Sequence, residues 1–235
     1  MKLNLLTYAD ELYAPMQAKL VEHARELKVF DEIYARNRNE LIQTSFYNDN
    51  QHILDVAKGG GLCAWKPYFI LETLKQMDDG DILLYMDSAD WIGEWFEYSQ
   101  YNHVNIKERV LGEMSLHEML LTAGAFPNKY YTKRDAFVYM GCDTEEYHNA
   151  IQIEAGVMLL KKSEYTKKIL LEWQKWCCVA NVINDEPNIC NLPNLDGFVG
   201  IRYDQSILSL IAKKNNIIPS DFIRKFVTCN VNNPI

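Results

Sequence analysis

Two carboxylates, Asp87 and Asp90, have the residue type and the position that a divalent-cation site requires. They follow the apolar run Ile82–Met86 and are separated by Ser88 and Ala89. A continuous apolar run of strand length between turn residues is typical of a central parallel strand covered on both faces. Ligands in open α/β sheets bind at the carboxyl ends of such strands. Carboxylate oxygens suit Mg²⁺ or Mn²⁺ beside a phosphate, whereas the plainer alternative is two turn aspartates that cap the next segment.

A lysine stands before this strand, at the start of a helix predicted from residue 67 to residue 77. Pro67 suits the first helical turn, and apolar residues recur at i, i+4 and i+7 from Ile70 onward. Glycines 59–61 supply conformational freedom just ahead of it. Because helix N-termini attract phosphate, Lys66 could offer a point charge to a diphosphate. The alternative is a solvated lysine at a helix start.

Strand and helix patterns alternate along the chain. Short apolar runs predict strands, and apolar residues at helical spacing predict helices. The predicted strands are 2–8, 30–35, 82–86, 137–140, 155–161 and 217–218, and the predicted helices are 13–27, 41–57 with a break near 48–50, 67–77, 164–179 and 204–214. A long loop is expected between 181 and 200. The alternation favours a parallel, doubly wound α/β sheet.

The composition predicts a soluble chain that fits one domain. Of its 235 residues 48% are hydrophobic, and a formal net charge of −8 argues against nucleic-acid or anionic-membrane partners. No apolar stretch approaches membrane-spanning length, and the N-terminus opens with a strand pattern rather than a signal peptide. The six cysteines form no CxxC pair and no zinc pattern, which favours reduced thiols. We therefore expect a cytoplasmic, soluble protein with no membrane span.

Four motifs occur in an order and spacing that are more specific together than alone. They are Trp65-Lys66-Pro67, the GDILLYMDSAD strand, Gln152-x-x-Ala155-Gly156, and Tyr203-Asp204-Gln205-Ser206. With them, the chain from Thr7 to Asn216 resembles small nucleotide-sugar glycosyltransferases of the GT-A fold. The likeness is greatest to a group found in capsule-type polysaccharide clusters and in large DNA viruses, which implies a bacterial or virus-infected host cytoplasm. The resemblance implies a single GT-A domain over residues 1–235, with a Rossmann-like, mostly parallel sheet flanked by helices and a mixed edge.

The resemblance also implies ligands. The donor would be a nucleoside diphosphate sugar, a UDP- or GDP-sugar, held with Mn²⁺ or Mg²⁺ at Asp87 and Asp90, and the acceptor a glycan hydroxyl. The cation would neutralise charge on the leaving diphosphate. The nucleotide would lie against the end of the first strand, where an aromatic ring could stack on the base, although Tyr13 could equally belong to a helix face. The implied donor-binding residues are Thr7, Tyr8, Ala9, Tyr13, Lys66, Asp87, Ser88 and Ala89.

The sequence departs from the family pattern in two places. The Asp-x-Asp motif is here Asp87-Ser88-Ala89-Asp90, so the second carboxylate comes one residue late. Either Asp90 is a ligand through a local bend, or Asp87 acts with water and a distant group. Some GT-A enzymes also use a C-terminal histidine as a metal ligand, but the last histidine here is His148. A degenerate transferase that binds nucleotide or glycan without catalysis is therefore the alternative function.

The catalytic candidates come from the later motifs. Asp204 could deprotonate or bind the acceptor hydroxyl, with Gln205 beside the anomeric centre, or it could be only the N-cap of the helix 204–214. Glu154, followed by two small residues that would let a sugar approach, could hydrogen-bond sugar hydroxyls. Asp143 is a weaker candidate for the base.

Overall fold

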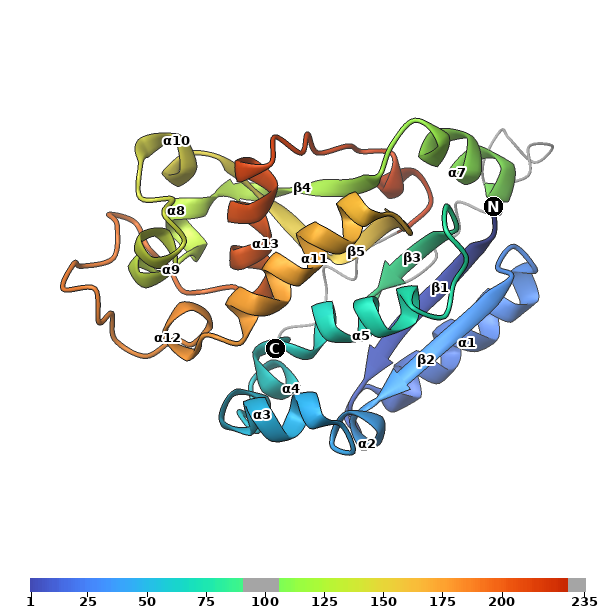
Figure 1. Ribbon diagram of the computed structural model, residues 1–235, viewed down its shortest axis with the longest axis horizontal. Helices are drawn as coiled ribbons and strands as arrows, with labels where there is room; N and C mark the ends of the chain where they lie inside the picture. Colours follow the sequence, from blue (N-terminus) through green and yellow to red (C-terminus); the bar gives the residue numbers. More distant parts are fainter. Residues whose placement is uncertain (91–105, 228–235) are drawn as a thin grey trace.

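The computed structural model of the protein describes residues 1–90 and 106–227, and these ranges form one five-stranded sheet with helices around it (Figure 1). The strands are β1 (Leu3–Ala9), β2 (Glu32–Asn37), β3 (Ile82–Met86), β4 (Met119–Pro127) and β5 (Ile151–Lys161). Their order across the sheet is β2-β1-β3-β5-β4. The apolar run before Asp87 is thus the central strand, as predicted.

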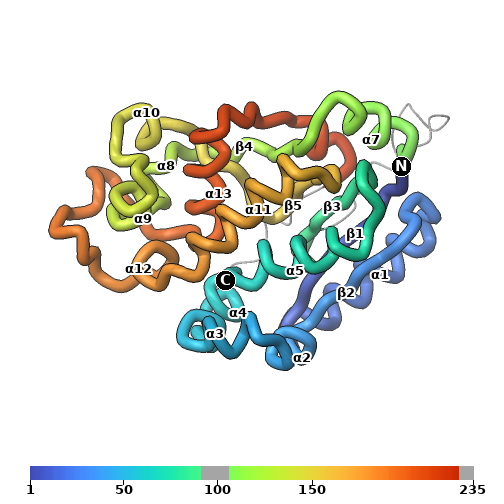
Figure 2. The backbone as a smooth tube through the Cα atoms, viewed as in Figure 1, coloured from blue at the N-terminus to red at the C-terminus, as the bar shows by residue number. Residues whose placement is uncertain are grey.

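The direction of the strands corrects one expectation. Strand β1 runs parallel to β2 and to β3, but β5 runs antiparallel to both β3 and β4. The sheet is therefore mixed on one side, as the resemblance predicted, and the parallel sheet predicted from the alternation is corrected at β5. Strands β4 and β5 are neighbours in sequence and in the sheet, so they pair antiparallel without a crossover. Figure 2 shows the first half of the chain building one side of the sheet and the second half the other.

Helices cover both faces of the sheet. One face packs against α5 (Trp65–Leu74), α11 (Glu164–Cys177) and α13 (Tyr203–Lys214), and the other packs against α1 (Ala14–Leu27) and α7 (Ile106–Ser115). Alternate residues of β3 enter the two cores, which explains why this strand has no polar side. The shorter helices are α2 (Arg38–Leu41), α3 (Ser45–Leu54), α4 (Gly59–Leu62), α8 (Asn128–Tyr131), α9 (Arg134–Tyr139), α10 (Glu145–His148), α12 (Ala180–Ile183) and the 3₁₀ turn η1 (Ile223–Lys225). Within the described ranges, no helix combines the length and apolar character needed to cross a membrane.

Short and irregular segments account for the errors in the predicted elements. The strand expected at 137–140 lies in and just after α9, since a four-residue apolar run fits a buried helix face as well as a strand. Residues 217–218 form no strand, and Ile218 is 83% exposed. The helix expected at 41–57 is split between α2 and α3, and α7 and β4 were not predicted. The longer predicted elements are confirmed, with shifted ends.

Residues 59–63, which begin with three glycines, form a turn in the left-handed backbone conformation, called the left-handed turn below. All five residues from Gly59 to Cys63 have positive φ, between 54° and 105°. Because an ordinary residue in this region costs about 1–2 kcal/mol, the turn is tolerable only where glycine supplies most of it. A Cβ on Gly61 would lie 2.8 Å from Leu54 Cα, so glycine is also required sterically there. The turn ends with the Gly59 carbonyl accepting a hydrogen bond from Trp65 Nε1 at 3.2 Å, which fixes that indole.

Candidate active site

A cavity of about 180 Å³ lies at the carboxyl ends of β1 and β3. Its lining includes six of the eight predicted donor-binding residues: Tyr8, Ala9, Tyr13, Asp87, Ser88 and Ala89. Gly59, Cys63 and Trp65 from the left-handed turn and α5 complete one wall. The remaining two predicted residues, Thr7 and Lys66, are buried behind this surface. The two strand ends thus meet as the α/β rule for ligand sites requires.

The two tyrosines on the cavity wall differ in how far their rings are exposed. The ring of Tyr8 is buried and stacks on Trp65, with ring centres 3.8 Å apart and an angle of 25° between the planes. Its other neighbour is Phe69, at 5.3 Å. Tyr13 is only half-buried. Tyr8 therefore builds the wall, and Tyr13 is the better placed of the two to meet a ligand.

The acidic pair converges through a tight turn. Strand β3 continues to Asp87, whose N–H donates to the Gly156 carbonyl at 2.8 Å, and the Asp90 N–H donates back to the Asp87 carbonyl at 3.0 Å. A Cβ on Gly156 would lie 3.0 Å from Asp90 Oδ2 and 3.3 Å from Asp87 Oδ2. The two carboxylates thus point toward the same position beside Gly156. The chain bends locally between them, as it must if Asp90 is to act as a ligand together with Asp87.

Strand β5 makes room for this pair by bulging. Leu121 pairs with Met158, but the next residue of β4, Thr122, pairs with Glu154, so three residues of β5 lie between them. Gly156 is the middle residue of this bulge and presents no side chain to the carboxylates. Bulges commonly re-aim the chain next to active sites. A larger residue at this position would occupy the space between Asp87 and Asp90.

Two carboxylates fit the way Mg²⁺ and Mn²⁺ are commonly held beside phosphates. Such ions need only one or two protein carboxylates when water and substrate phosphates supply the other ligands. Across residues 1–90 and 106–227, no three His, Cys, Asp or Glu side chains form a group that could hold an ion by themselves. The donor set at Asp87 and Asp90 therefore suits an ion that binds together with a diphosphate, and metal binding remains a prediction.

Lys66 lies beneath the acidic pair rather than on the cavity surface. Its side chain is 3% exposed, and its Nζ donates hydrogen bonds to the Ala155 carbonyl oxygen at 3.1 Å and to Asp87 Oδ2 at 3.4 Å. Nζ also forms ion pairs, at 3.1 Å, with Asp87 Oδ1 and Asp204 Oδ2. Burial alone lowers the pKa of Lys66, but the carboxylates of Asp204 and Asp87 raise it further than burial lowers it. The ammonium stays charged and joins α5, α13, β5 and the end of β3.

Asp204 belongs to this buried cluster. Helix α13 begins at Tyr203 with Arg202 as its N-cap residue, so the expectation that Asp204 caps the helix is wrong. Its side chain is buried, and its backbone carbonyl accepts a hydrogen bond from Trp173 Nε1 at 2.9 Å. Burial raises the pKa of Asp204 to about 6, against the opposing effect of Lys66. Asp204 is therefore a carboxyl group whose protonation changes close to neutral pH.

Gln205 is held against β5. Its Nε2 donates to Gln152 Oε1 at 3.1 Å, and its Oε1 accepts from the Ala155 N–H at 3.4 Å. Ala155 thus contacts both Gln205 and, through its carbonyl, Lys66. The motifs around residues 152–156 and 203–206, distant in sequence, meet in one place.

The other two catalytic candidates have partners elsewhere. Glu154 Oε1 accepts from Arg224 at 2.8 Å, and its pKa is raised by burial against the effect of that arginine. No hydrogen bond or ion pair within the described ranges joins Glu154 to the Lys66 cluster. Asp143 is paired with Arg134 at 2.9 Å and with His148 at 2.8 Å. The structure thus brings Asp204 and Gln205 to the acidic pair but neither Glu154 nor Asp143.

Sequence reasoning missed Tyr85 and left Trp65 without a role. Trp65 was part of a motif, and only the left-handed turn explains why its indole forms a wall of the cavity. Tyr85 was hidden in the apolar run of β3. The one available signal was its position two residues before Asp87, which places both side chains on one face of the strand.

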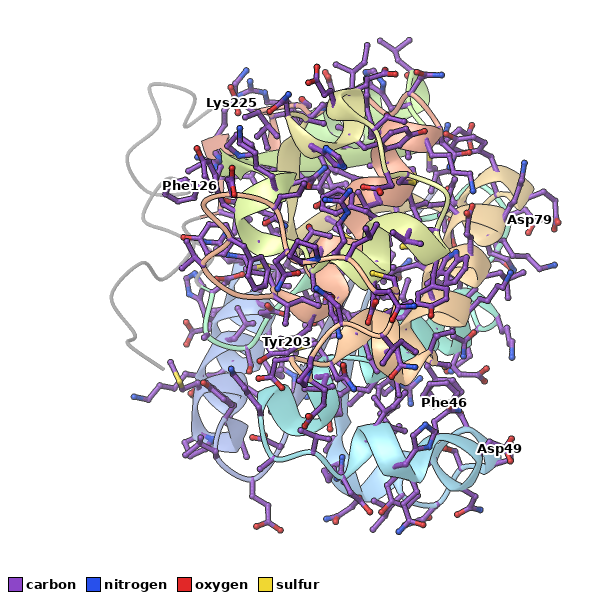
Figure 3. All side chains as sticks on the ribbon, turned by 90° about the vertical axis from the view of Figure 1, so that its left-hand side faces the viewer. Phe46, Asp49, Asp79, Phe126, Tyr203 and Lys225 are labelled. Atoms are coloured by element: carbon purple, nitrogen blue, oxygen red, sulfur yellow. The ribbon has the colours of Figure 1, made fainter. Side chains whose placement is uncertain are left out.

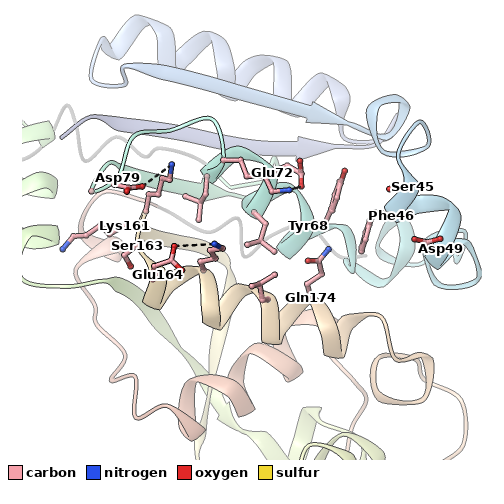
Figure 4. A pocket seen from close by; sticks show the side chains of 17 residues that line it. Ser45, Phe46, Asp49, Tyr68, Glu72, Asp79, Lys161, Ser163, Glu164 and Gln174 are labelled. Atoms are coloured by element: carbon pink, nitrogen blue, oxygen red, sulfur yellow. Dashed lines mark hydrogen bonds and ion pairs between the residues drawn. The ribbon is translucent and has the colours of Figure 1, made fainter.

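A second hollow, of about 910 Å³, lies between α3, α5 and α11 (Figure 4). It reaches Asp79 and Gly80, which precede β3, and so extends to the end of that strand opposite to Asp87. Phe46, Asp49 and Asp79 lie along one edge of the molecule in Figure 3, away from Tyr203. The lysines in its wall are paired with acidic residues: Lys75 with Glu72, Lys161 with Glu118, Lys162 with Asp79 and Lys167 with Glu164. Three of the four acidic residues in this wall, Glu72, Asp79 and Glu164, are thus paired with lysines.

Comparison with solved structures identifies the type of fold, whereas comparison of sequences finds no match. No protein-family model matches the chain, and no curated protein matches it in sequence. Among solved structures, the bifunctional glycosyltransferase WbbM aligns with 89% of this chain at 9% identity and a TM-score of 0.51, and the alignment covers 37% of WbbM. A glycosyltransferase involved in glycosylation of the major capsid of PBCV-1 aligns over 85% of this chain and 81% of its own, at 11% identity and a TM-score of 0.41. Mouse xyloside xylosyltransferase 1 aligns over 94% and 84%, at 14% identity and a TM-score of 0.47. The predicted GT-A type of fold is confirmed.

Proposed function

We propose that this chain is a metal-dependent glycosyltransferase that moves a sugar from a nucleoside diphosphate sugar to a hydroxyl of a glycan. The observation that carries the proposal is the convergence of Asp87 and Asp90 on Gly156, with Asp87 also lining the strand-end cavity. A GT-A type of fold supports it, because the cavity lies at the strand ends where open α/β sheets bind ligands. Fold alone would not establish the reaction.

In this proposal the nucleoside lies against the end of β1 and the diphosphate against the acidic pair. Tyr13 is the aromatic residue assigned to the base, because Tyr8 is packed against Trp65. Thr7 supports the strand from within the core. Asp87 and Asp90 would hold Mn²⁺ or Mg²⁺, which supplies charge neutralisation to the leaving diphosphate when bound. A UDP- or GDP-sugar remains the proposed donor.

Asp204 and Gln205 are the proposed catalytic pair. A general base works best when its pKa is close to the working pH, and burial raises the pKa of Asp204 to about 6. Lys66 favours the ionised form of Asp204, which is the form that can accept the acceptor proton. Gln205, oriented by Gln152 and Ala155, would present its amide next to the transferred sugar. Glu154 remains a weaker candidate for contacts with sugar hydroxyls, since Arg224 already binds it.

A thermal-shift series tests the proposal. UDP, GDP and their sugars are added with and without Mn²⁺, because a ligand that binds only the folded chain raises the melting temperature. We expect a shift with one nucleoside diphosphate that depends on Mn²⁺, together with Mn²⁺-dependent hydrolysis of the matching donor. No shift with any nucleotide would refute the proposal.

A non-catalytic protein that binds nucleotide or glycan is the second candidate. It is favoured by the buried ion pair that Lys66 makes with both Asp87 and Asp204, since this cation already neutralises much of the acidic charge. Mn²⁺-dependent nucleotide binding without donor hydrolysis or transfer would select this alternative.

A further inference from the structure

The hydroxyl group of Tyr85 is an exception in a strand that is otherwise apolar. Its side chain is fully buried in the central strand β3, among residues that pack into the core. A phenylalanine would fill the same space without a polar group. Burying a hydroxyl without a hydrogen-bond partner costs about 1–3 kcal/mol, so the partner that it finds indicates its role.

That partner is the carboxylate of Asp87. Tyr85 Oη donates to Asp87 Oδ1 at 2.5 Å, from two residues earlier on the same face of the strand. Asp87 itself is 39% exposed, so its carboxylate lies at the boundary between the core and the cavity.

The two oxygens of Asp87 therefore have different surroundings. Oδ1 receives the Tyr85 hydroxyl and lies 3.1 Å from Lys66 Nζ. Oδ2 accepts a hydrogen bond from Lys66 Nζ at 3.4 Å and also faces the space over Gly156 that Asp90 Oδ2 borders. Because Oδ1 is held from below, rotation of the carboxylate about its last bond is restricted.

We propose that Tyr85 is a positioning residue: its hydroxyl holds Asp87 Oδ1 so that Oδ2 faces Asp90 and can offer its second lone pair to a divalent cation. The proposal rests on the proposed function, since it deepens the role of the acidic pair. Tyr85 does not touch the ion or the donor and acts through Asp87. Hydrogen bonds of this kind to metal-ligating groups commonly change metal affinity about 10–100-fold when they are removed.

The test compares Tyr85→Phe with wild type in direct Mn²⁺ titrations monitored by electron paramagnetic resonance, first without nucleotide and then with saturating UDP or GDP. Phenylalanine keeps the ring, its packing and the net charge of the cluster. Tyr139→Phe is the matched control, because Tyr139 is 44% exposed at the end of α9. Melting temperatures of the metal-free proteins are measured in parallel to separate a positioning role from a purely structural one.

We expect Tyr85→Phe to weaken Mn²⁺ binding about 10-fold or more, with Tyr139→Phe equal to wild type. A crystal structure of Tyr85→Phe should show Asp87 rotated or in two orientations. If Tyr85→Phe lowers the melting temperature but binds Mn²⁺ like wild type, the hydroxyl is structural and the positioning role is refuted. If wild type itself binds no Mn²⁺, alone or with nucleotide, the proposed metal dependence fails and the positioning role with it.

Discussion

The buried carboxyl group of Asp204 should make the folded protein less stable as the pH rises from about 4 to about 6. Its pKa rises from 3.8 to about 6 on folding, mainly because the group is buried, although Lys66 opposes the shift. Between these two values the folded chain keeps a proton that the unfolded chain has released. The contribution is therefore fully present below the unfolded pKa and is lost as the pH rises through the folded pKa.

The size of the effect follows from the shift. Each pKa unit corresponds to about 1.4 kcal/mol, so the group contributes at most about 3 kcal/mol to the difference in unfolding free energy between pH 4 and pH 7.5. Asp204→Asn keeps the shape of the side chain and removes the titration. The variant should therefore lack this part of the pH dependence.

Urea unfolding of both metal-free proteins at pH 4 and pH 7.5 measures the difference. Asp31, Asp55 and Asp135 act in the opposite direction, because their pKa values are lowered in the folded protein, whereas Glu154 acts in the same direction, because its pKa is raised. They are present in both proteins and cancel when the wild-type change with pH is compared with that of Asp204→Asn. The reasoning is refuted if the two proteins show the same pH dependence, or if wild type gains more stability than the variant as the pH rises.

Four further changes test the site and the turn. Asp87→Ala should abolish Mn²⁺-dependent donor binding in calorimetry and should also lower the melting temperature, because it leaves the buried Tyr85 hydroxyl without its partner and removes one of the carboxylates paired with Lys66. Lys66→Ala should weaken binding of a nucleoside diphosphate more than that of the bare nucleoside, since the loss acts through the acidic pair. Asp204→Asn should lower the transfer rate by about 10²–10⁴-fold at saturating donor, with donor affinity nearly unchanged, because a general base is lost. Gly61→Ala should lower the unfolding free energy in urea by at least about 1–3 kcal/mol, since its Cβ would meet Leu54.

Specific outcomes would contradict these expectations. Turnover by Asp204→Asn at the wild-type rate would show that the base lies elsewhere. Transfer by Asp87→Ala at the wild-type rate, or transfer unaffected by a chelator, would show that no cation at Asp87 takes part in the reaction. An equal loss for nucleoside and diphosphate in Lys66→Ala would indicate a packing defect around α5. Gly80→Ala is the control for the turn, because Gly80 also has positive φ but nothing lies within 4 Å of an added Cβ. Equal destabilisation of the two glycine variants would show that the clash with Leu54 is unimportant.

The central strand and its acidic end could be predicted because their signals are local. An apolar run between turn residues is buried on both faces wherever it lies in an α/β sheet, and Asp87 necessarily follows it. The amphipathic helices α1, α11 and α13 were predicted for the same reason, since their periodicity is a property of neighbouring residues. The GT-A type of fold came from the order of several such motifs.

The partners of the charged residues could not be predicted, because they come from distant parts of the chain. Lys66 and Asp204 are separated by more than half of the sequence, and only the packing of α5 and α13 on one face of the sheet brings them together. The same packing removes Lys66 from solvent and turns its charge toward two carboxylates instead of the cavity. Local sequence shows a lysine before a proline, and burial decides what that lysine binds.

The chain by itself determined that a carboxylate follows the central strand, whereas tertiary structure alone decided which oxygen of that carboxylate faces outward. That choice depends on the Tyr85 hydroxyl below it and on the bulge of β5 that leaves Gly156 beside Asp90. Strand propensity depends on neighbouring residues in the sequence. A hydrogen bond depends on the distance between two atoms and is sensitive to changes of a few tenths of an ångström in it. Those distances are set when the sheet and its helices pack, so they follow from the fold as a whole.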